Sequence, residues 1–310
     1  MRPAWSVLWL TTLVGCAQGL AVALGLTALG MFGGLAAAQQ AGGVGLLLVL
    51  GLGVVALVAS FLHLGRPERA WRAVAMWRTS WLSREVIALP AFLGVAALCW
   101  LALRELGAWP EVLAVVLLLA ALVLWVCTAM IYAGVRFIRE WATPLTLLNF
   151  TLMGLASGFV LAAALFAGLQ LPAGELTAWA AGFTLLAFLA RMVAVLRLAR
   201  LIPAGSLQTA IGVRSRNINQ VARGFTAGSF NLHEFFHGQS AAMVRGVQGG
   251  FVLLGFIVPL ALLGVALGAA QPLPWLSAVW LLQMLGFLLE RWHFFAQVNH
   301  PQNRYYAAAH

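Results

Sequence analysis

Eight long apolar runs constrain this chain more than any other feature of its sequence. A helix needs about 20 apolar residues to cross a hydrocarbon core of about 30 Å, and it must satisfy its backbone polar groups internally. The runs lie at residues 5–32, 43–64, 82–103, 112–134, 144–168, 176–198, 244–267 and 275–296. We therefore predict an all-α, polytopic bundle of eight transmembrane helices, forming a single integral membrane domain over residues 1–310.

The composition agrees with this architecture and excludes a water-soluble fold. Of the 310 residues, 63% are hydrophobic and 8% are charged, whereas soluble domains carry about a quarter charged residues. The formal net charge of +10 would suggest nucleic acid as the partner of a soluble protein. Here the basic residues lie in short connectors, where they set topology and contact anionic lipid. We expect membrane lipid, and no nucleic acid, among the partners.

The charged residues gather at one end of the predicted helices. With eight spans, both termini lie on one side, called side A, together with the connectors after the second, fourth and sixth spans. The opposite connectors, on side B, hold a single arginine, Arg104, beside several glutamates. By the positive-inside rule side A is cytoplasmic, so both termini are expected in the cytoplasm.

The longest connector, residues 199–243, is polar and lies on side A. It admits two interpretations: a loop whose arginines contact lipid, or a docking platform for a soluble partner, with Arg214, Arg216, His233 and His237 as the docking residues. His233 and His237 also match the H-E-x-x-H pattern of zinc proteases. A catalytic zinc needs a third protein ligand, and no further motif supplies one, so no metal site is predicted.

Ionisable residues flank the connector between the second and third spans. His63 ends one span and Glu85 begins the next, at a depth where such residues are costly and therefore suggest function. One interpretation is an interfacial belt of arginine and tryptophan with a satisfied histidine. The other is a quinone pocket, in which His63 and Glu85 exchange protons with quinone oxygens. The residues that would shape this pocket are Arg66, Trp71, Arg78, Trp81 and Ser83.

This stretch resembles a known family. The segment His63-Leu64-Gly65, then Pro67, Arg69-Ala70, Leu82-Ser83 and Glu85 is similar to the membrane anchor subunit of bacterial dimethyl sulfoxide reductase and its relatives. The resemblance implies that the histidine and the glutamate take part in quinol binding and oxidation. It also implies an anchor without haem that exchanges electrons between ubiquinone or menaquinone and a ferredoxin-like iron-sulfur subunit. Iron-sulfur clusters and molybdopterin would belong only to partner subunits, and this chain would not be catalytic alone.

The long connector and the ending from Glu290 to Asn303 resemble the branch of the family that anchors cytoplasm-facing molybdoenzymes, which includes the anchor of membrane-bound sulfite dehydrogenase. This resemblance implies a protein of the bacterial inner membrane that passes electrons from sulfite to quinone, with residues 199–243 docking the iron-sulfur subunit. Two alternatives stay open: a quinol-oxidising anchor of a dimethyl sulfoxide reductase-like enzyme, and a secondary transporter. Transporters usually bind substrate near the membrane midplane, where this sequence lacks charges.

A second ionisable group lies at the side A end of the last span. Glu290 and His293 are one helical turn apart, and Arg191 lies inside the sixth span toward the same side. An ion pair between Arg191 and Glu290 is the first interpretation. The alternative is that Glu290 relays protons to or from the pocket.

Overall fold

The computed structural model describes residues 3–61, 66–201, 206–215, 217–218 and 237–298. Within these ranges the chain is helical and contains no strand. Among the described residues, eight helical segments are long and apolar enough to cross a membrane, in agreement with the predicted number of spans. They are α1 (Trp5–Ala28), α2 (Gly34–Phe61), α3 (Trp81–Leu106), α4 (Glu111–Ala133), α5 (Pro144–Gly168), α6 (Gly174–Ala199), the segment Ala241–Gly268 and α11 (Leu273–Ala296). The described parts of the connectors contain two short helices: a 3₁₀-helix, η1 (Pro67–Met76), and α7 (Leu207–Ile211).

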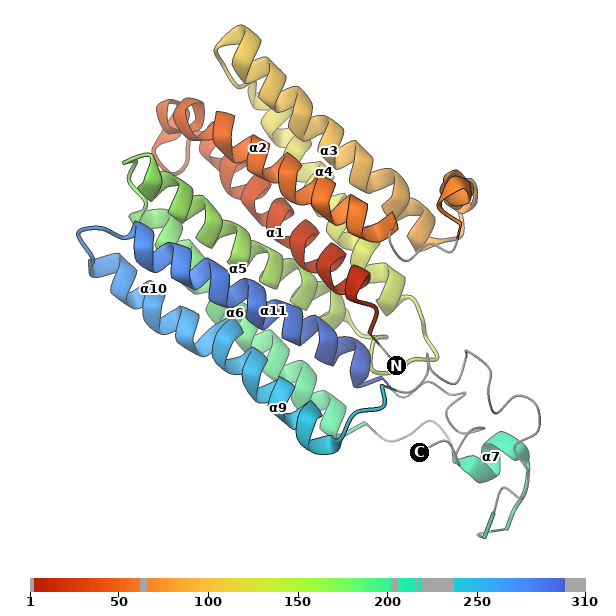
Figure 1. Ribbon diagram of the computed structural model, residues 1–310. Helices are drawn as coiled ribbons and strands as arrows, with labels where there is room; N and C mark the ends of the chain where they lie inside the picture. Colours follow the sequence, from red (N-terminus) through yellow and green to blue (C-terminus); the bar gives the residue numbers. More distant parts are fainter. Residues whose placement is uncertain (1–2, 62–65, 202–205, 216, 219–236, 299–310) are drawn as a thin grey trace.

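The spans form two groups of four (Figure 1). In the first group α1 packs on α2 and α4, and α3 packs on both of these. In the second group α5 packs on α6 and α11, and the segment Ala241–Gly268 packs on α11 and α6. The helices α6 and α11 therefore face one another across the second group, so long side chains from both can meet at its centre.

Glycines let the two groups meet at α1 and α5. Each helix carries two glycines four residues apart at the contact, Gly15 and Gly19 on α1 and Gly154 and Gly158 on α5. A Cβ atom added to Gly19 would lie 2.0 Å from the Gly154 carbonyl oxygen, and one added to Gly158 would lie 2.2 Å from the Gly19 carbonyl carbon. Only glycine allows such a close backbone approach between membrane helices.

The start of α1 and the end of α11 lie on the same side of the bundle. Leu8, near the start of α1, lies in one buried cluster with Phe294 and Phe295, near the end of α11. This agrees with an even number of spans. The cytoplasmic orientation of this side remains a prediction from the arginine bias.

Two predicted boundaries at the first turn were wrong. The first helix ends at Ala28 rather than residue 32, and α2 begins at Gly34 rather than residue 43. Gly30 and Gly33 adopt positive φ angles of 99° and 91°, a conformation that glycine adopts without steric cost, and this turn ends α1. The glutamines early in α2 interrupt the apolar run without ending the helix, and the Gln39 amide donates to the Gly107 carbonyl across side B.

The seventh span is not a uniform α-helix, which the apolar run did not predict. It consists of α9 (Ala241–Val252), a π-helical turn η3 (Leu253–Ile257) and α10 (Val258–Gly268). Pro259 explains the turn, because a proline ring clashes with the carbonyl four residues earlier in an α-helix. The wider turn also brings Gly255 against Gly286 of α11. A Cβ atom added to Gly286 would lie 2.2 Å from the Gly255 nitrogen.

Candidate functional site

Glu85 is buried at the side A end of the first group of helices. The Ser80 side chain caps α3 by accepting a hydrogen bond from the Ser83 N–H, which places Glu85 in the second turn of the helix, facing α4. Its side chain accepts a hydrogen bond of 2.6 Å from the Thr128 hydroxyl of α4. Both residues are buried, with Glu85 9% exposed and Thr128 4% exposed. A threonine hydroxyl from the neighbouring helix thus holds the carboxyl group in place.

The arginine next to Glu85 in sequence does not neutralise it. The Arg84 guanidinium donates to the carbonyls of Trp77 and Arg78, at 2.9 Å each, and it lies 4.1 Å from the centre of the Trp81 ring. Within the described part of the chain, Glu85 forms no ion pair. Among the described residues, its carboxyl group is therefore held by a neutral hydrogen bond and not by a permanent cation.

A proline lies one turn further along α3. Because Pro90 lacks an N–H, the carbonyl of Val86 loses its usual helical donor. This carbonyl belongs to the residue next to Glu85, so the backbone here offers a hydrogen-bond acceptor beside the carboxyl group. Spans tolerate proline where other groups or a cavity satisfy the freed carbonyl.

The structure brings together part of the predicted pocket. Ser83 and Glu85 are buried, and Trp81 packs against the end of α4, where an added Cβ on Gly134 would lie 3.3 Å from the indole ring. Three other predicted residues, Arg66, Trp71 and Arg78, are exposed. His63 lies outside the described residues, and its role stays a prediction.

The predicted docking residues fall mostly outside the described ranges. Arg216 and His233 lie outside them, as does much of the connector 199–243. Arg214 is described and exposed, and the His237 ring lies 6.4 Å from that of Trp292. Among the described residues, no group of three or more histidine, cysteine or acidic side chains could hold a metal ion. The docking role of this connector remains a prediction.

A second buried carboxylate lies in the other group of helices. Glu290 of α11 is fully buried between two arginines, with Arg191 Nε of α6 at 2.7 Å from Oε1 and Arg291 Nε at 2.5 Å from Oε2. The predicted pair of Arg191 and Glu290 is confirmed. Its contact is an ion pair by distance, although the Nε–H does not point at the oxygen. All three charged side chains are at most 4% exposed.

The surroundings of these arginines complete the cluster. Arg191 Nη2 lies 3.3 Å from His293 Nδ1, and because a guanidinium only donates, this nitrogen must be the acceptor and the ring proton lies on Nε2. Arg291 donates to the Met153 sulfur and lies 4.0 Å from the centre of the Phe150 ring. The burial of Arg291, the neighbour of Glu290 in the sequence, was not predicted.

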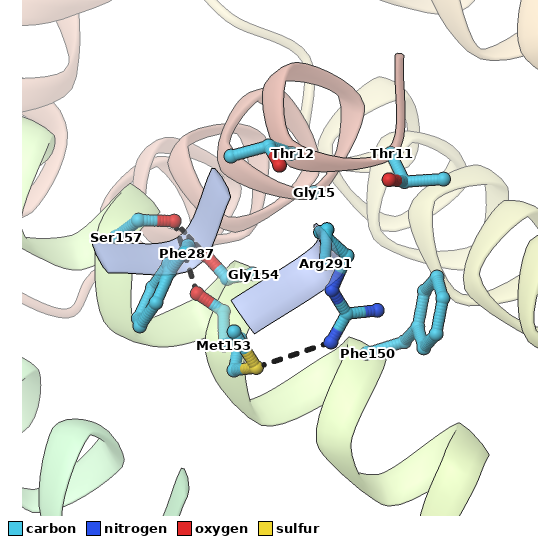
Figure 2. Close-up of a pocket in the computed structure, with 9 residues that line it drawn as sticks. All are labelled: Thr11, Thr12, Gly15, Phe150, Met153, Gly154, Ser157, Phe287 and Arg291. Carbon is cyan, nitrogen blue, oxygen red and sulfur yellow. Dashed lines mark hydrogen bonds between the residues drawn. The ribbon is translucent and has the colours of Figure 1, made fainter. Parts of the chain in front are cut away.

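Arg291 also points toward a small cavity where α1, α5 and α11 meet (Figure 2). Thr11, Thr12 and Ser157 contribute hydroxyl groups to its wall, and each donates its proton to a carbonyl of its own helix. The cavity offers about 20 Å³ to a water-sized sphere, which is room for a single water molecule. It is too small for a quinone ring.

Aromatic side chains separate the two buried glutamates. Tyr132 lies one turn after Thr128 on α4, and its ring stacks on Phe150 at 5.7 Å and meets Phe294 at 5.5 Å. Arg291 packs on the far side of the same cluster, over Phe150. An aromatic cluster thus lies between Glu85 and the charged side chains of the second group.

The fold and the buried carboxyl group define a polytopic membrane subunit with an ionisable site near side A. A family model described as DMSO reductase anchor subunit (DmsC) matches residues 1–296. The chain is 46% identical to a subunit of the sulfite dehydrogenase of Allochromatium vinosum over 324 aligned residues, which cover 99% of both proteins. It is 34% identical to the anaerobic dimethyl sulfoxide reductase chain YnfH of Escherichia coli K12 over 123 residues, 38% of this chain and 41% of that one. The chain belongs to the DMSO reductase anchor subunit (DmsC) family.

Proposed function

We propose that this protein is the quinone-reactive membrane anchor of a molybdopterin and iron-sulfur oxidoreductase. The observation that carries the proposal is Glu85, a buried carboxyl group with a hydroxyl donor and no described cation, in a member of an anchor subunit family. Membership of the anchor subunit family also favours an anchor role over a transporter role. The chain would work only with its partner subunits and would not be catalytic alone.

The chemistry at this site is proton exchange with a quinone substrate. Reduction of a quinone to a quinol takes up two electrons and two protons. The electrons would come from an iron-sulfur subunit docked on side A, and Glu85 and His63 would deliver the protons to the two quinone oxygens. Thr128 would orient the Glu85 carboxyl group, and Trp81 and Ser83 would stand beside it at the interface. Ubiquinone and menaquinone both fit this chemistry.

We further propose that electrons flow from sulfite to quinone. The relative named as a sulfite dehydrogenase subunit aligns over nearly the whole of both chains, whereas the dimethyl sulfoxide reductase chain aligns over less than half of each. The arginine bias favours side A as the cytoplasmic face of the bacterial inner membrane. The ferredoxin-like iron-sulfur subunit and the molybdopterin subunit would then bind in the cytoplasm, on the connector 199–243.

Quinone-linked turnover of the purified, assembled complex tests this proposal. We expect the complex to contain bound quinone and the variant His63→Ala to lose quinone reduction while partner subunits still co-purify. Unchanged turnover and quinone content in this variant would overturn the site. Two assays decide the direction of electron flow: sulfite with quinone, and dimethyl sulfoxide with quinol. Turnover in the second assay but not in the first would favour the reductase alternative.

A further inference from the structure

The short helix η1 lies outside the bundle at the side A end of α3, in the orange part of the chain (Figure 1). Arg84 ties its end to α3 through the carbonyls of Trp77 and Arg78. Its apolar side chains are nevertheless uncovered, with Trp71 70% exposed, Met76 60% and Trp77 52%. Such a concentration of exposed apolar side chains indicates an interaction surface.

The 3₁₀ winding of η1 places its tryptophans and its arginines on different faces. A 3₁₀-helix has three residues per turn, so side chains three residues apart stand directly above one another. Trp71, Val74 and Trp77 therefore share one face, while Arg69 and Arg72 share another. In an α-helix each three-residue step would turn the side chain by about 60°, and both rows would drift around the axis.

Further arginines continue the same spacing on both sides of the helix. Arg66 directly precedes η1 and Arg78 follows it, so arginines occur at three-residue intervals, with Ala75 as the one interruption. The single acidic residue of the helix, Glu68, lies in the first turn and is 3.9 Å from the Arg69 guanidinium. The cationic row thus keeps an excess of positive charge beside an apolar row.

We propose that η1 lies flat on the membrane at side A and binds the headgroups of anionic phospholipids. Its tryptophan face would rest among the upper acyl chains, as tryptophan does at membrane interfaces. Its arginine row would contact lipid phosphates, which guanidinium groups match in geometry. Charge complementarity and the position of η1 beside the membrane helix α3 favour lipid over a soluble partner as the ligand of this surface. The inference does not depend on the quinone role.

A fluorescent probe on Val74→Cys tests the proposal in the full-length protein. The native cysteines, Cys16, Cys99 and Cys127, are all buried, so labelling is expected at the new site alone. Spin-labelled phosphatidylglycerol, titrated into the detergent-solubilised protein, should quench the probe at lower concentration than spin-labelled phosphatidylcholine. If both lipids quench equally, the headgroup selectivity is wrong; a probe on Met76→Cys repeats the test should the first label disturb the helix.

The decisive variant exchanges two neighbours, Arg72→Ala with Ala73→Arg, which keeps composition and charge but moves the arginine off the row. An arginine at a membrane surface changes lipid affinity about fivefold, so the half-quenching concentration of phosphatidylglycerol should rise about fivefold. The control Arg245→Ala removes an exposed arginine elsewhere on side A and should leave the half-quenching concentration of phosphatidylglycerol unchanged. Wild-type quenching in the exchanged variant would overturn the proposal. So would unchanged lipid quenching combined with loss of partner subunits from the purified complex, which would make η1 a protein-docking element.

Discussion

Glu85 and Glu290 are both glutamates buried near the same side of the membrane, yet their surroundings differ. Glu290 lies between two arginines that are themselves buried, whereas Glu85 has only a hydroxyl donor and its neighbouring Arg84 turns away. A carboxylate fixed by two permanent cations cannot readily accept a proton. A carboxyl group held by one neutral hydrogen bond can accept and release one.

The difference supports separate roles for the two groups of helices within the proposed function. In the first group the buried carboxyl group is suited to proton exchange, which quinone chemistry requires. In the second group Glu290 joins α6 and α11, which face one another across the bundle, and so stabilises the fold. This disfavours the alternative in which Glu290 relays protons.

Removing the Glu290 charge should have the largest effect on stability. The variant Glu290→Gln leaves Arg191 and Arg291 buried without a counter-charge, and breaking a buried ion pair in this way costs about 3–5 kcal/mol. We expect a large loss of thermal stability in detergent, measured by the fraction that remains monodisperse after heating. The matched variant Glu85→Gln should lose at most about 1 kcal/mol, since the amide oxygen still accepts from Thr128. Equal losses in the two variants would remove the distinction between the two glutamates.

The contact between the two groups should respond to a single methyl group. Gly158→Ala would place a Cβ 2.2 Å from the backbone of Gly19, and overpacking of this kind costs about 1–3 kcal/mol. Gly182→Ala is the control, because an added Cβ there meets no atom within 4 Å. Thermal denaturation of both variants measures the effect. Equal stability of the two would show that the close approach of α1 and α5 does not hold the groups together.

Removing the hydroxyl group that positions Glu85 should lower both the stability of the protein and its quinone turnover. Thr128→Val removes the donor of a buried hydrogen bond, which costs about 1–3 kcal/mol, and it leaves the carboxyl group without its fixed orientation. We expect quinone turnover to fall about tenfold and Thr128→Ser to restore it. Thr27→Val is a control, because that buried hydroxyl only donates within its own helix. Loss of turnover in Thr128→Ser as well would speak against hydrogen bonding as the cause.

The number of spans and the pair of Arg191 and Glu290 could be predicted from the sequence. The length of an apolar run and the presence of a charged residue within it can both be seen in a short stretch of sequence. It could not predict that Thr128 faces Glu85, since that contact depends on which helices are neighbours and how they are rotated. The burial of Arg291 was missed for the same reason: an arginine near the end of a span usually extends to the interface. The π-helical turn was missed because Pro259 lies in an uninterrupted apolar run.

The exposure of Arg66, Trp71 and Arg78 shows a further limit of sequence reasoning. Arginine and tryptophan near His63 and Glu85 predicted a pocket. Trp71 lies on the 3₁₀-helix η1, Arg66 and Arg78 lie just outside it, and all three side chains are exposed. A pocket wall and a membrane-surface helix can share this composition, so the exposure of these side chains could not be predicted from it.

Quinone turnover per intact complex, compared between Glu85→Gln and wild type, tests the central claim most directly. The substitution keeps the size of the side chain and an acceptor for Thr128, but it removes the exchangeable proton. We predict a complex that assembles with its partner subunits and keeps near wild-type thermal stability, with turnover reduced about 100-fold or more. Wild-type turnover by the assembled Glu85→Gln complex would contradict the assignment of proton exchange to Glu85.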